Sequence, residues 1–134
     1  GEAKAGFCSI VNGEITVGVS DATPMLEQAL SSDGYFFRQY PLVVGGQLVE
    51  NRPKGRALRK ALAELDGHIS VIASTRRLTL HDFSQALIDL GVRNAIYLVG
   101  SSSTGLYTDA DGRRTIIGQA DRKTADNVNF IVWR

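Results

Sequence analysis

Turn-forming residue pairs divide this sequence into short apolar runs. Asn12-Gly13 separates the runs 7–11 and 15–19, and Asp66-Gly67 precedes the run 68–73. Both central residues of a type I′ turn need a positive φ, which asparagine, aspartate and glycine tolerate best. The pattern therefore predicts β-hairpins at these two places, in a chain rich in strands.

Segment 56–65 carries two opposing signals. Its apolar residues recur at helical spacing, and its composition favours a helix. The Asp66-Gly67 pair that follows instead indicates a hairpin, in which at least 60–64 would be the partner strand. We expect a strand here.

Two other segments predict helices. Pro24 can occupy the first turn of a helix with Thr23 as its cap. The second helix begins at Thr79, which has Asp82 three residues later, and it ends at Gly91. The expected apolar stripes are Met25, Leu26, Ala29 and Leu30 in the first helix, and Phe83, Ala86, Leu87 and Leu90 in the second.

Further apolar runs predict strands separated by glycine-containing turns. These strands are expected at 35–44, 47–49, 94–99, 106–107, 115–117 and 128–133. Many strands with two main helices indicate the α+β class, with a mixed multi-stranded sheet. We expect a single domain over 1–134, because this length can build one core and is too short for two ordinary domains.

Composition narrows the function classes. A formal net charge of +1 does not suggest the basic face of a nucleic-acid binder, so no nucleic-acid partner is expected. No run approaches the about 20 apolar residues that span a bilayer, so no membrane insertion is expected.

Cys8, the only cysteine, cannot form an internal disulfide, and we expect it to be a small buried residue in a strand. The sequence indicates no metal site and no cofactor.

The Gly/Ser/Thr-rich loop 100–105 is the most informative candidate for ligand contacts. Its backbone N–H groups and hydroxyls suit phosphate or sugar oxygens. Gly100 and Gly105 have the spacing of a P-loop, but Leu106 stands where a P-loop has lysine, which disfavours nucleotide hydrolysis. The alternative interpretation is a plain polar connection.

Histidine and arginine side chains elsewhere in the sequence are further candidates for catalysis or phosphate binding. His81, beside Asp82 at the start of a predicted helix, is a candidate for proton transfer, although a histidine at such a position more often caps the helix or faces solvent. No Gly-x-Ser-x-Gly motif supports a serine hydrolase, and His68 is expected at the surface. Arg38 and Arg59 carry planar forks that grip phosphate, and otherwise they would lie on an exposed strand face or in salt bridges.

Four segments, taken in order, resemble the motifs of one family. Residues 32–36 are similar to an Asn-Gly-Gly-Phe-Phe strand entry, and Arg59-Lys60-Ala61 is similar to an Arg-Thr-Ala segment before an Asp-Gly hairpin. A helix ending in Leu90-Gly91 follows, and 95–103 is similar to Ala-Leu-Asn-Leu-Asp-Gly-Gly-Gly-Ser. Over roughly residues 30–105 the chain resembles the phosphodiester glycosidase family, that of the mannose 6-phosphate uncovering enzyme. The resemblance also favours a strand at 60–64.

The chain departs from these motifs at three polar positions. Ser32 and Tyr97 stand where the family has asparagine, and Val99 stands where it has aspartate. Valine in place of a carboxylate removes any acid–base or electrostatic role at that point. The departures therefore favour weak or rearranged catalysis.

The resemblance implies a site for a carbohydrate phosphate. Arg59 would bind the phosphate, and His81 would be the proton-transfer candidate; these two are the catalytic candidates. The residues expected to contact the substrate are Gly34, Arg38, Tyr97, Gly100, Ser101, Ser102 and Ser103.

Three functions remain open at this stage. They are a hydrolase of a sugar phosphodiester with a rearranged site, a non-catalytic carbohydrate- or phosphate-binding relative, and a structural or interaction domain. Val99 favours binding over catalysis, and the retained Arg59 argues against a purely structural role. The expected partner is a small-molecule or polymeric carbohydrate phosphate. Family members are commonly exported, so the resemblance implies a periplasmic or extracellular location.

Overall fold

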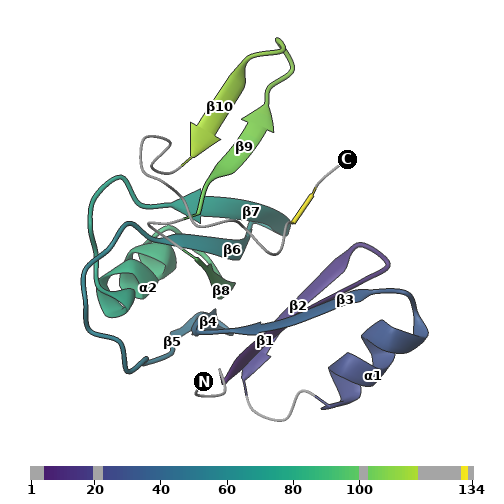
Figure 1. Ribbon diagram of the computed structural model, residues 1–134. Coiled ribbons are helices and arrows are strands. Elements are labelled where there is room, and N and C mark those ends of the chain that lie inside the picture. The colour runs from purple at the N-terminus through teal and green to yellow at the C-terminus, as the bar shows by residue number, and fades with distance from the viewer. Residues whose placement is uncertain (1–4, 20–22, 100–102, 118–130, 133–134) are drawn as a thin grey trace.

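The computed structural model describes residues 5–19, 23–99, 103–117 and 131–132, which form two helices and ten strands (Figure 1). The α+β class with two main helices is therefore confirmed. In chain order the elements are β1 (Gly6–Val11), β2 (Glu14–Val19), α1 (Thr23–Ser31), β3 (Tyr35–Gln39), β4 (Pro41–Val44), β5 (Gln47–Leu48), β6 (Lys60–Leu65), β7 (His68–Ala73), α2 (Leu80–Asp89), β8 (Asn94–Leu98), β9 (Gly105–Thr108) and β10 (Arg114–Ile117).

The described strands form two larger sheets and one separate hairpin. A three-stranded sheet has the order β2-β1-β3, and a five-stranded sheet has the order β5-β4-β8-β6-β7. Every pair of described strands is antiparallel, whereas the sequence predicts a mixed sheet. The run 35–44 is divided at Tyr40, where the chain passes from the first sheet to the second. Pro41 has no N–H to donate to a ladder, and it stands at the first position of β4, where a strand tolerates it.

Both predicted two-residue hairpins are present. Asn12 and Gly13 have φ angles of 52° and 79°, and Asp66 and Gly67 have 51° and 74°, as a type I′ turn requires. β6 pairs with β7 along its whole length, which confirms the predicted strand over 60–64. Its other edge pairs with β8, and these two ladders outweigh the helical propensity of the segment.

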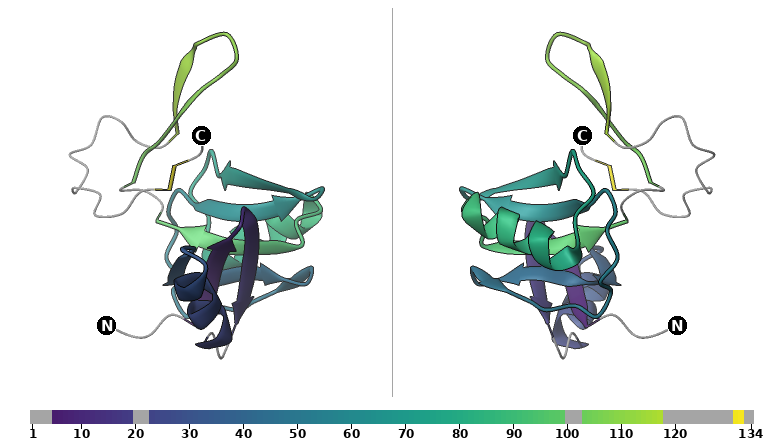
Figure 2. Two further views of the ribbon diagram at one scale, coloured as in Figure 1. Left: turned by 90° about the vertical axis from the view of Figure 1, so that its right-hand side faces the viewer. Right: turned by 90° about the vertical axis from the view of Figure 1, so that its left-hand side faces the viewer.

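Helix α2 and the three-stranded sheet cover opposite faces of the five-stranded sheet (Figure 2). The face toward α2 presents Ala61 and Ala63, whose small side chains leave room for the helix. The opposite face presents Leu62 and Ile96, which pack with Cys8 of β1. Cys8 is completely buried, as predicted, and this burial raises the pKa of its thiol to about 12. Neighbouring residues of β6 thus enter different layers of the fold.

Helix α2 has the predicted ends. Thr79 is its N-cap and accepts a hydrogen bond from the backbone N–H of Asp82 at 3.0 Å. Gly91 follows the C-cap residue Leu90 with a φ of 91°. Leu90 is 59% exposed, so the predicted apolar stripe turns away from the core at the last turn.

Helix α1 buries less of its predicted stripe. Only Ala29 is buried, while Leu26 and Leu30 are 38% and 75% exposed. Among the described elements the helix packs mainly against β1 and β3, and much of the expected apolar face stays exposed.

The β9–β10 hairpin projects from the rest of the described chain (Figure 1). It confirms the strands expected at 106–107 and 115–117. The strand expected at 128–133 lies outside the described residues except for 131–132. No helix among the described residues is long and apolar enough to cross a membrane.

Candidate functional site

The beginning of β6 lies beside the end of β8 in the five-stranded sheet. The register pairs Lys60 with Leu98 and Ala61 with Tyr97. Side chains alternate along a strand, so Arg59 reaches Tyr97 on the α2 side while Lys60 lies on the opposite face with Leu98. Two cationic residues that are adjacent in the sequence therefore enter two different layers.

The guanidinium of Arg59 is held by neutral acceptors. The residue is 7% exposed. Its Nε donates to the carbonyl oxygen of Leu78 at 2.9 Å, its Nη1 donates to Tyr97 Oη at 3.2 Å, and its Nη2 donates to the carbonyl oxygen of Gly55. The side chain thus joins the segment before β6, the segment before α2 and strand β8.

Lys60 is the second buried cation and was missed as a site candidate in the sequence. It is 6% exposed, and its Nζ donates to the carbonyl oxygen of Ser103. Desolvation by burial lowers the pKa of its amino group. The available signal was its position in the Arg59-Lys60-Ala61 segment, because the similar family motif has threonine there.

Neither buried cation is paired with a carboxylate among the described residues. The ion pairs of this part of the chain are Lys54 with Glu50, Arg56 with Asp82, and His81 with Glu50. A buried charge without a counter-charge costs several kcal/mol, which hydrogen bonds to carbonyl oxygens offset only in part. An anion bound beside either cation would offset more of the cost of burying that cation.

Tyr97 occupies the position where the family motif has asparagine. Its ring lies 5.6 Å from the Arg59 guanidinium carbon, and the rings of Tyr97 and Tyr40 have centroids 6.4 Å apart. A cation over an aromatic face is attracted by the ring quadrupole. The ring and the hydroxyl together therefore help to hold Arg59 in place.

Of the four expected substrate contacts in loop 100–105, only Ser103 is described. Gly100, Ser101 and Ser102 lie outside the described residues. The Ser103 hydroxyl donates to the carbonyl oxygen of Val99, and the Ser103 carbonyl accepts from Lys60. The end of this turn therefore lies at the same edge of the sheet as the two buried cations.

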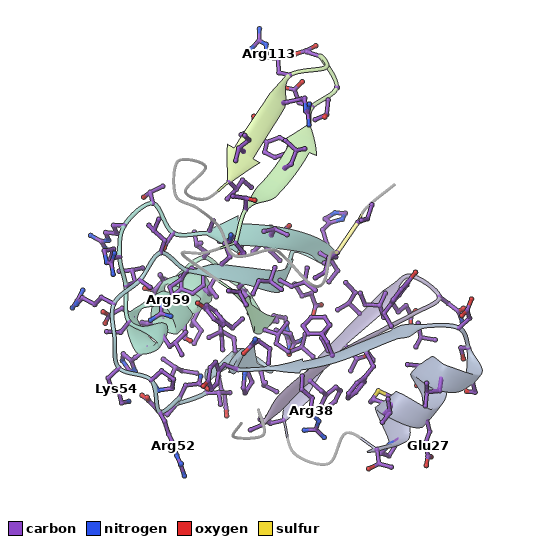
Figure 3. The ribbon with its side chains drawn as sticks, in the orientation of Figure 1. Glu27, Arg38, Arg52, Lys54, Arg59 and Arg113 are labelled. Atoms are coloured by element: carbon purple, nitrogen blue, oxygen red, sulfur yellow. The ribbon has the colours of Figure 1, made fainter. Side chains whose placement is uncertain are left out.

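Gly34 and Arg38 lie elsewhere in the fold. Gly34 connects α1 to β3, and a Cβ atom there would stand 2.5 Å from the carbonyl oxygen of Ile10. Its place is explained by this close backbone approach, which only glycine permits. Arg38 is exposed on β3 of the three-stranded sheet, and Figure 3 shows it well apart from Arg59.

His81 forms a separate exposed pair with Glu50. Its Nδ1 lies 2.6 Å from Glu50 Oε1, and the two side chains are 50% and 59% exposed. The hydrogen bond from His81 is the main reason that the pKa of Glu50 lies below its usual value, and desolvation opposes it. The charges of His81 and Lys54 lower this pKa further. The described contacts of His81 do not include Arg59, Lys60 or Tyr97.

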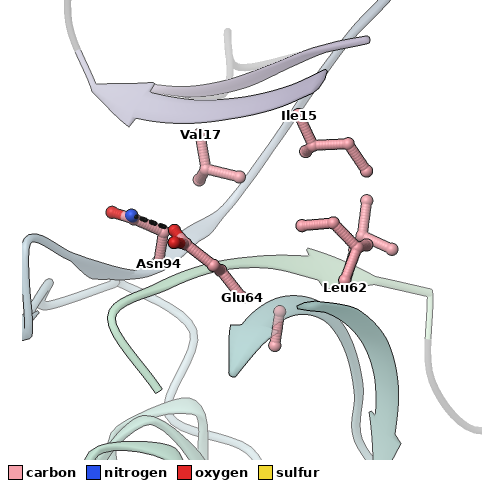
Figure 4. A pocket seen from close by; sticks show the side chains of 7 residues that line it. Ile15, Val17, Leu62, Glu64 and Asn94 are labelled. Carbon is pink, nitrogen blue, oxygen red and sulfur yellow. Dashed lines mark hydrogen bonds between the residues drawn. The ribbon is translucent and has the colours of Figure 1, made fainter. Parts of the chain in front are cut away.

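The hollow between the two larger sheets is not a ligand cavity. It is lined mostly by apolar side chains and has no interior space that would hold a water molecule (Figure 4). Its polar residues satisfy each other, because Asn94 Nδ2 donates to Glu64 Oε2 at 2.7 Å. The described residues also contain no group of three His, Cys, Asp or Glu side chains that could hold a metal ion. The edge with Arg59 and Lys60 is therefore the stronger candidate.

The fold and this edge define an α+β domain with two buried cations beside a polar turn. A family model described as phosphodiester glycosidase matches residues 2–131, and the chain belongs to this family. Comparison with curated proteins and with solved structures gave no match. The match extends beyond residues 30–105 on both sides, and it confirms the resemblance drawn from the four motifs.

Proposed function

We propose that this domain binds a sugar phosphodiester or a related anionic carbohydrate, with weak or rearranged catalysis. Membership of the phosphodiester glycosidase family supports a carbohydrate phosphate as the ligand. The observation that carries the proposal is the pair of buried cations, Arg59 and Lys60, with no described carboxylate partner. Phosphate is a suitable counter-charge for either of these cations.

The polar positions at this edge favour binding over turnover. Val99 supplies no carboxylate, and Arg59 is fixed by three neutral acceptors. The exposed His81 is engaged with Glu50, so a proton-transfer role for it needs a substrate that extends to the start of α2. A non-catalytic carbohydrate- or phosphate-binding domain of an exported pathway is the second candidate, and the missing carboxylate favours it.

We also propose a location for this domain. Members of the family are commonly exported, and this family membership alone supports the proposal that the domain lies in the periplasm or outside the cell.

The test is a titration with glucose 1-phosphate, with glucose as the neutral control, followed by NMR shifts of the backbone amides. We expect millimolar or tighter binding of the phosphate only, and a loss of about tenfold or more in Lys60→Met, because one charged hydrogen bond is worth about 1.5–3 kcal/mol. Arg114→Met removes an exposed cation of β10 and serves as the matched control. Absence of binding at millimolar ligand would leave a structural role.

A second assay measures sugar release from methyl glucosyl phosphate. We expect weak or absent release by the wild type. Robust release that Arg59→Ala abolishes would establish an active hydrolase and overturn the preference for binding.

A further inference from the structure

Two exposed loops next to the Arg59 edge carry a concentration of positive charge. The segment from β5 to β6 contributes three cations, and the segment from β7 to α2 contributes two. All five residues are exposed, and Figure 3 shows Arg52 and Lys54 directed away from the protein. This basic loop surface consists of Arg52, Lys54, Arg56, Arg76 and Arg77.

The two loops lie side by side. Ala57 and Leu78 exchange two backbone hydrogen bonds, of 3.0 and 2.9 Å. Arg77 Nη2 also donates to the carbonyl oxygen of Arg56 at 3.0 Å. Residues from both loops therefore contribute to one continuous surface.

The charge of this surface stands out against the rest of the chain. It holds five of the 15 lysine and arginine residues, with Glu50 and Asp82 as its paired carboxylates. These seven residues carry a formal charge of +3, whereas the whole chain carries +1, so the other residues together are negative. Such an uneven distribution attracts a polyanion to one face.

Arg59 lies beneath this surface and fixes it. Its hydrogen bonds reach the carbonyl oxygens of Gly55 in the first loop and Leu78 in the second. A buried link between both loops reduces the conformational entropy that a ligand would otherwise have to remove. The cations are thus presented on a preorganised frame.

We propose that the basic loop surface binds an extended polyanionic glycan, one that carries phosphate groups along its chain. Exposed cations on two adjoining loops fit repeated charges along a polymer better than a single small ligand. The two loops, residues 49–59 and 74–79, contain no Phe, Trp or Tyr, so they lack the stacking platforms that single-stranded nucleic acids use. The inference extends the proposed function from one sugar phosphate at Arg59 and Lys60 to a polymer that runs across neighbouring loops.

The experiment measures binding of phosphorylated dextran by the full chain at rising salt concentration. Unmodified dextran and a single-stranded oligothymidine are compared under the same conditions. We expect binding of phosphorylated dextran alone, with an affinity that falls as salt rises because bound counterions are released. The double variant Lys54→Glu/Arg76→Glu should bind about tenfold or more weakly, because it reverses two of the five charges.

The control variant is Arg113→Glu/Arg114→Glu at the end of the β9–β10 hairpin, which makes the same change in net charge far from the basic loop surface (Figure 3). It should bind phosphorylated dextran as the wild type does. Equal losses in both double variants, equal binding of unmodified dextran, or tighter binding of oligothymidine would each overturn the proposal. Circular dichroism of both variants verifies that they are folded.

The binding measurements can contradict the buried phosphate site and the basic loop surface independently of each other. Lys54→Glu/Arg76→Glu should retain the glucose 1-phosphate affinity, while Lys60→Met should retain most of the polymer affinity. Polymer binding without monomer binding would support the basic loop surface and contradict the buried site. Monomer binding without polymer binding would do the reverse.

Discussion

Arg59 Nη1 donates to the Tyr97 hydroxyl at 3.2 Å, and the guanidinium carbon lies 5.6 Å from the centroid of the same ring. This contact joins the residue before β6 to a residue near the end of β8, and the two strands are paired. A residue that departs from the family motif thus holds the arginine that the motif retains. Arg59 consequently has a structural role in addition to the proposed contact with phosphate.

The first prediction separates these two roles of Arg59. Arg59→Lys should lower the free energy of unfolding in urea by about 2–4 kcal/mol, because lysine cannot reproduce the fork that reaches three separate acceptors. Arg114→Lys, an exposed change, should stay within about 0.5 kcal/mol of the wild type. Unchanged stability with lost glucose 1-phosphate binding would show that Arg59 serves the ligand alone.

The second prediction concerns Gly34. Gly34→Ala should destabilise the domain by about 1–3 kcal/mol, because the new Cβ would stand 2.5 Å from a backbone oxygen that cannot move cheaply. Gly55→Ala is the matched control, since a Cβ there would meet no atom within 4 Å. Thermal unfolding of both variants gives the comparison. A wild-type melting temperature for Gly34→Ala would argue that its role lies in the substrate site.

The third prediction follows from the buried amino group of Lys60. Its pKa is lowered by desolvation, so the unfolded chain holds this proton more tightly than the folded one. Wild-type stability should therefore gain relative to Lys60→Met as pH rises through the lowered pKa toward that of an exposed lysine, about 10.4. Urea unfolding from about pH 7 to about pH 10 measures the difference between the two proteins.

At neutral pH, Lys60→Met should be at least as stable as the wild type, because an apolar side chain of similar length avoids the cost of burying charge. Lys54→Met is the control, since it makes the same substitution at a lysine whose side chain is 72% exposed. A clearly destabilised Lys60→Met at neutral pH would mean that the hydrogen bond to Ser103 outweighs the burial cost.

The fourth prediction concerns the thiol of Cys8. Because it is completely buried with its pKa raised to about 12, iodoacetamide should label it very slowly in the native state and rapidly in denaturant. The unfolded thiol ionises from about pH 9, so stability should decline as pH rises from there toward 12. Cys8→Ala should lack this part of the pH dependence. Native labelling at the rate of the unfolded chain would contradict the burial.

Part of the candidate site was accessible from the motifs, and part was not. The motif match identified Arg59 and Tyr97, which do contact each other, and Ser103, which meets Lys60. It also suggested Arg38, but that residue lies on β3 of the other sheet. Arg38 and Arg59 are separated because the chain passes from one sheet to the other at Tyr40. No local sequence pattern predicts this change of sheet.

The charged partner of His81 also could not be predicted from the neighbouring residues. The sequence places it beside Asp82, yet its close partner is Glu50, 31 residues earlier. The pairing depends on the path of the segment between β5 and β6, which packs against the beginning of α2. Contacts of this kind are set by tertiary packing and not by local preference.

By itself the sequence determined the features that depend on a few neighbouring residues. Both type I′ turns, the Thr79 cap of α2 and the missing carboxylate at Val99 belong to this group, because backbone φ preferences and side-chain chemistry act locally. For residues 60–65 the sequence carried two opposing signals, and the tertiary structure supplies the reason that the predicted strand forms, since ladders with β7 and β8 override the helical propensity. It also decided that Arg59 and Lys60 are both buried, because the alternation of a strand between two packed layers sends one side chain into each.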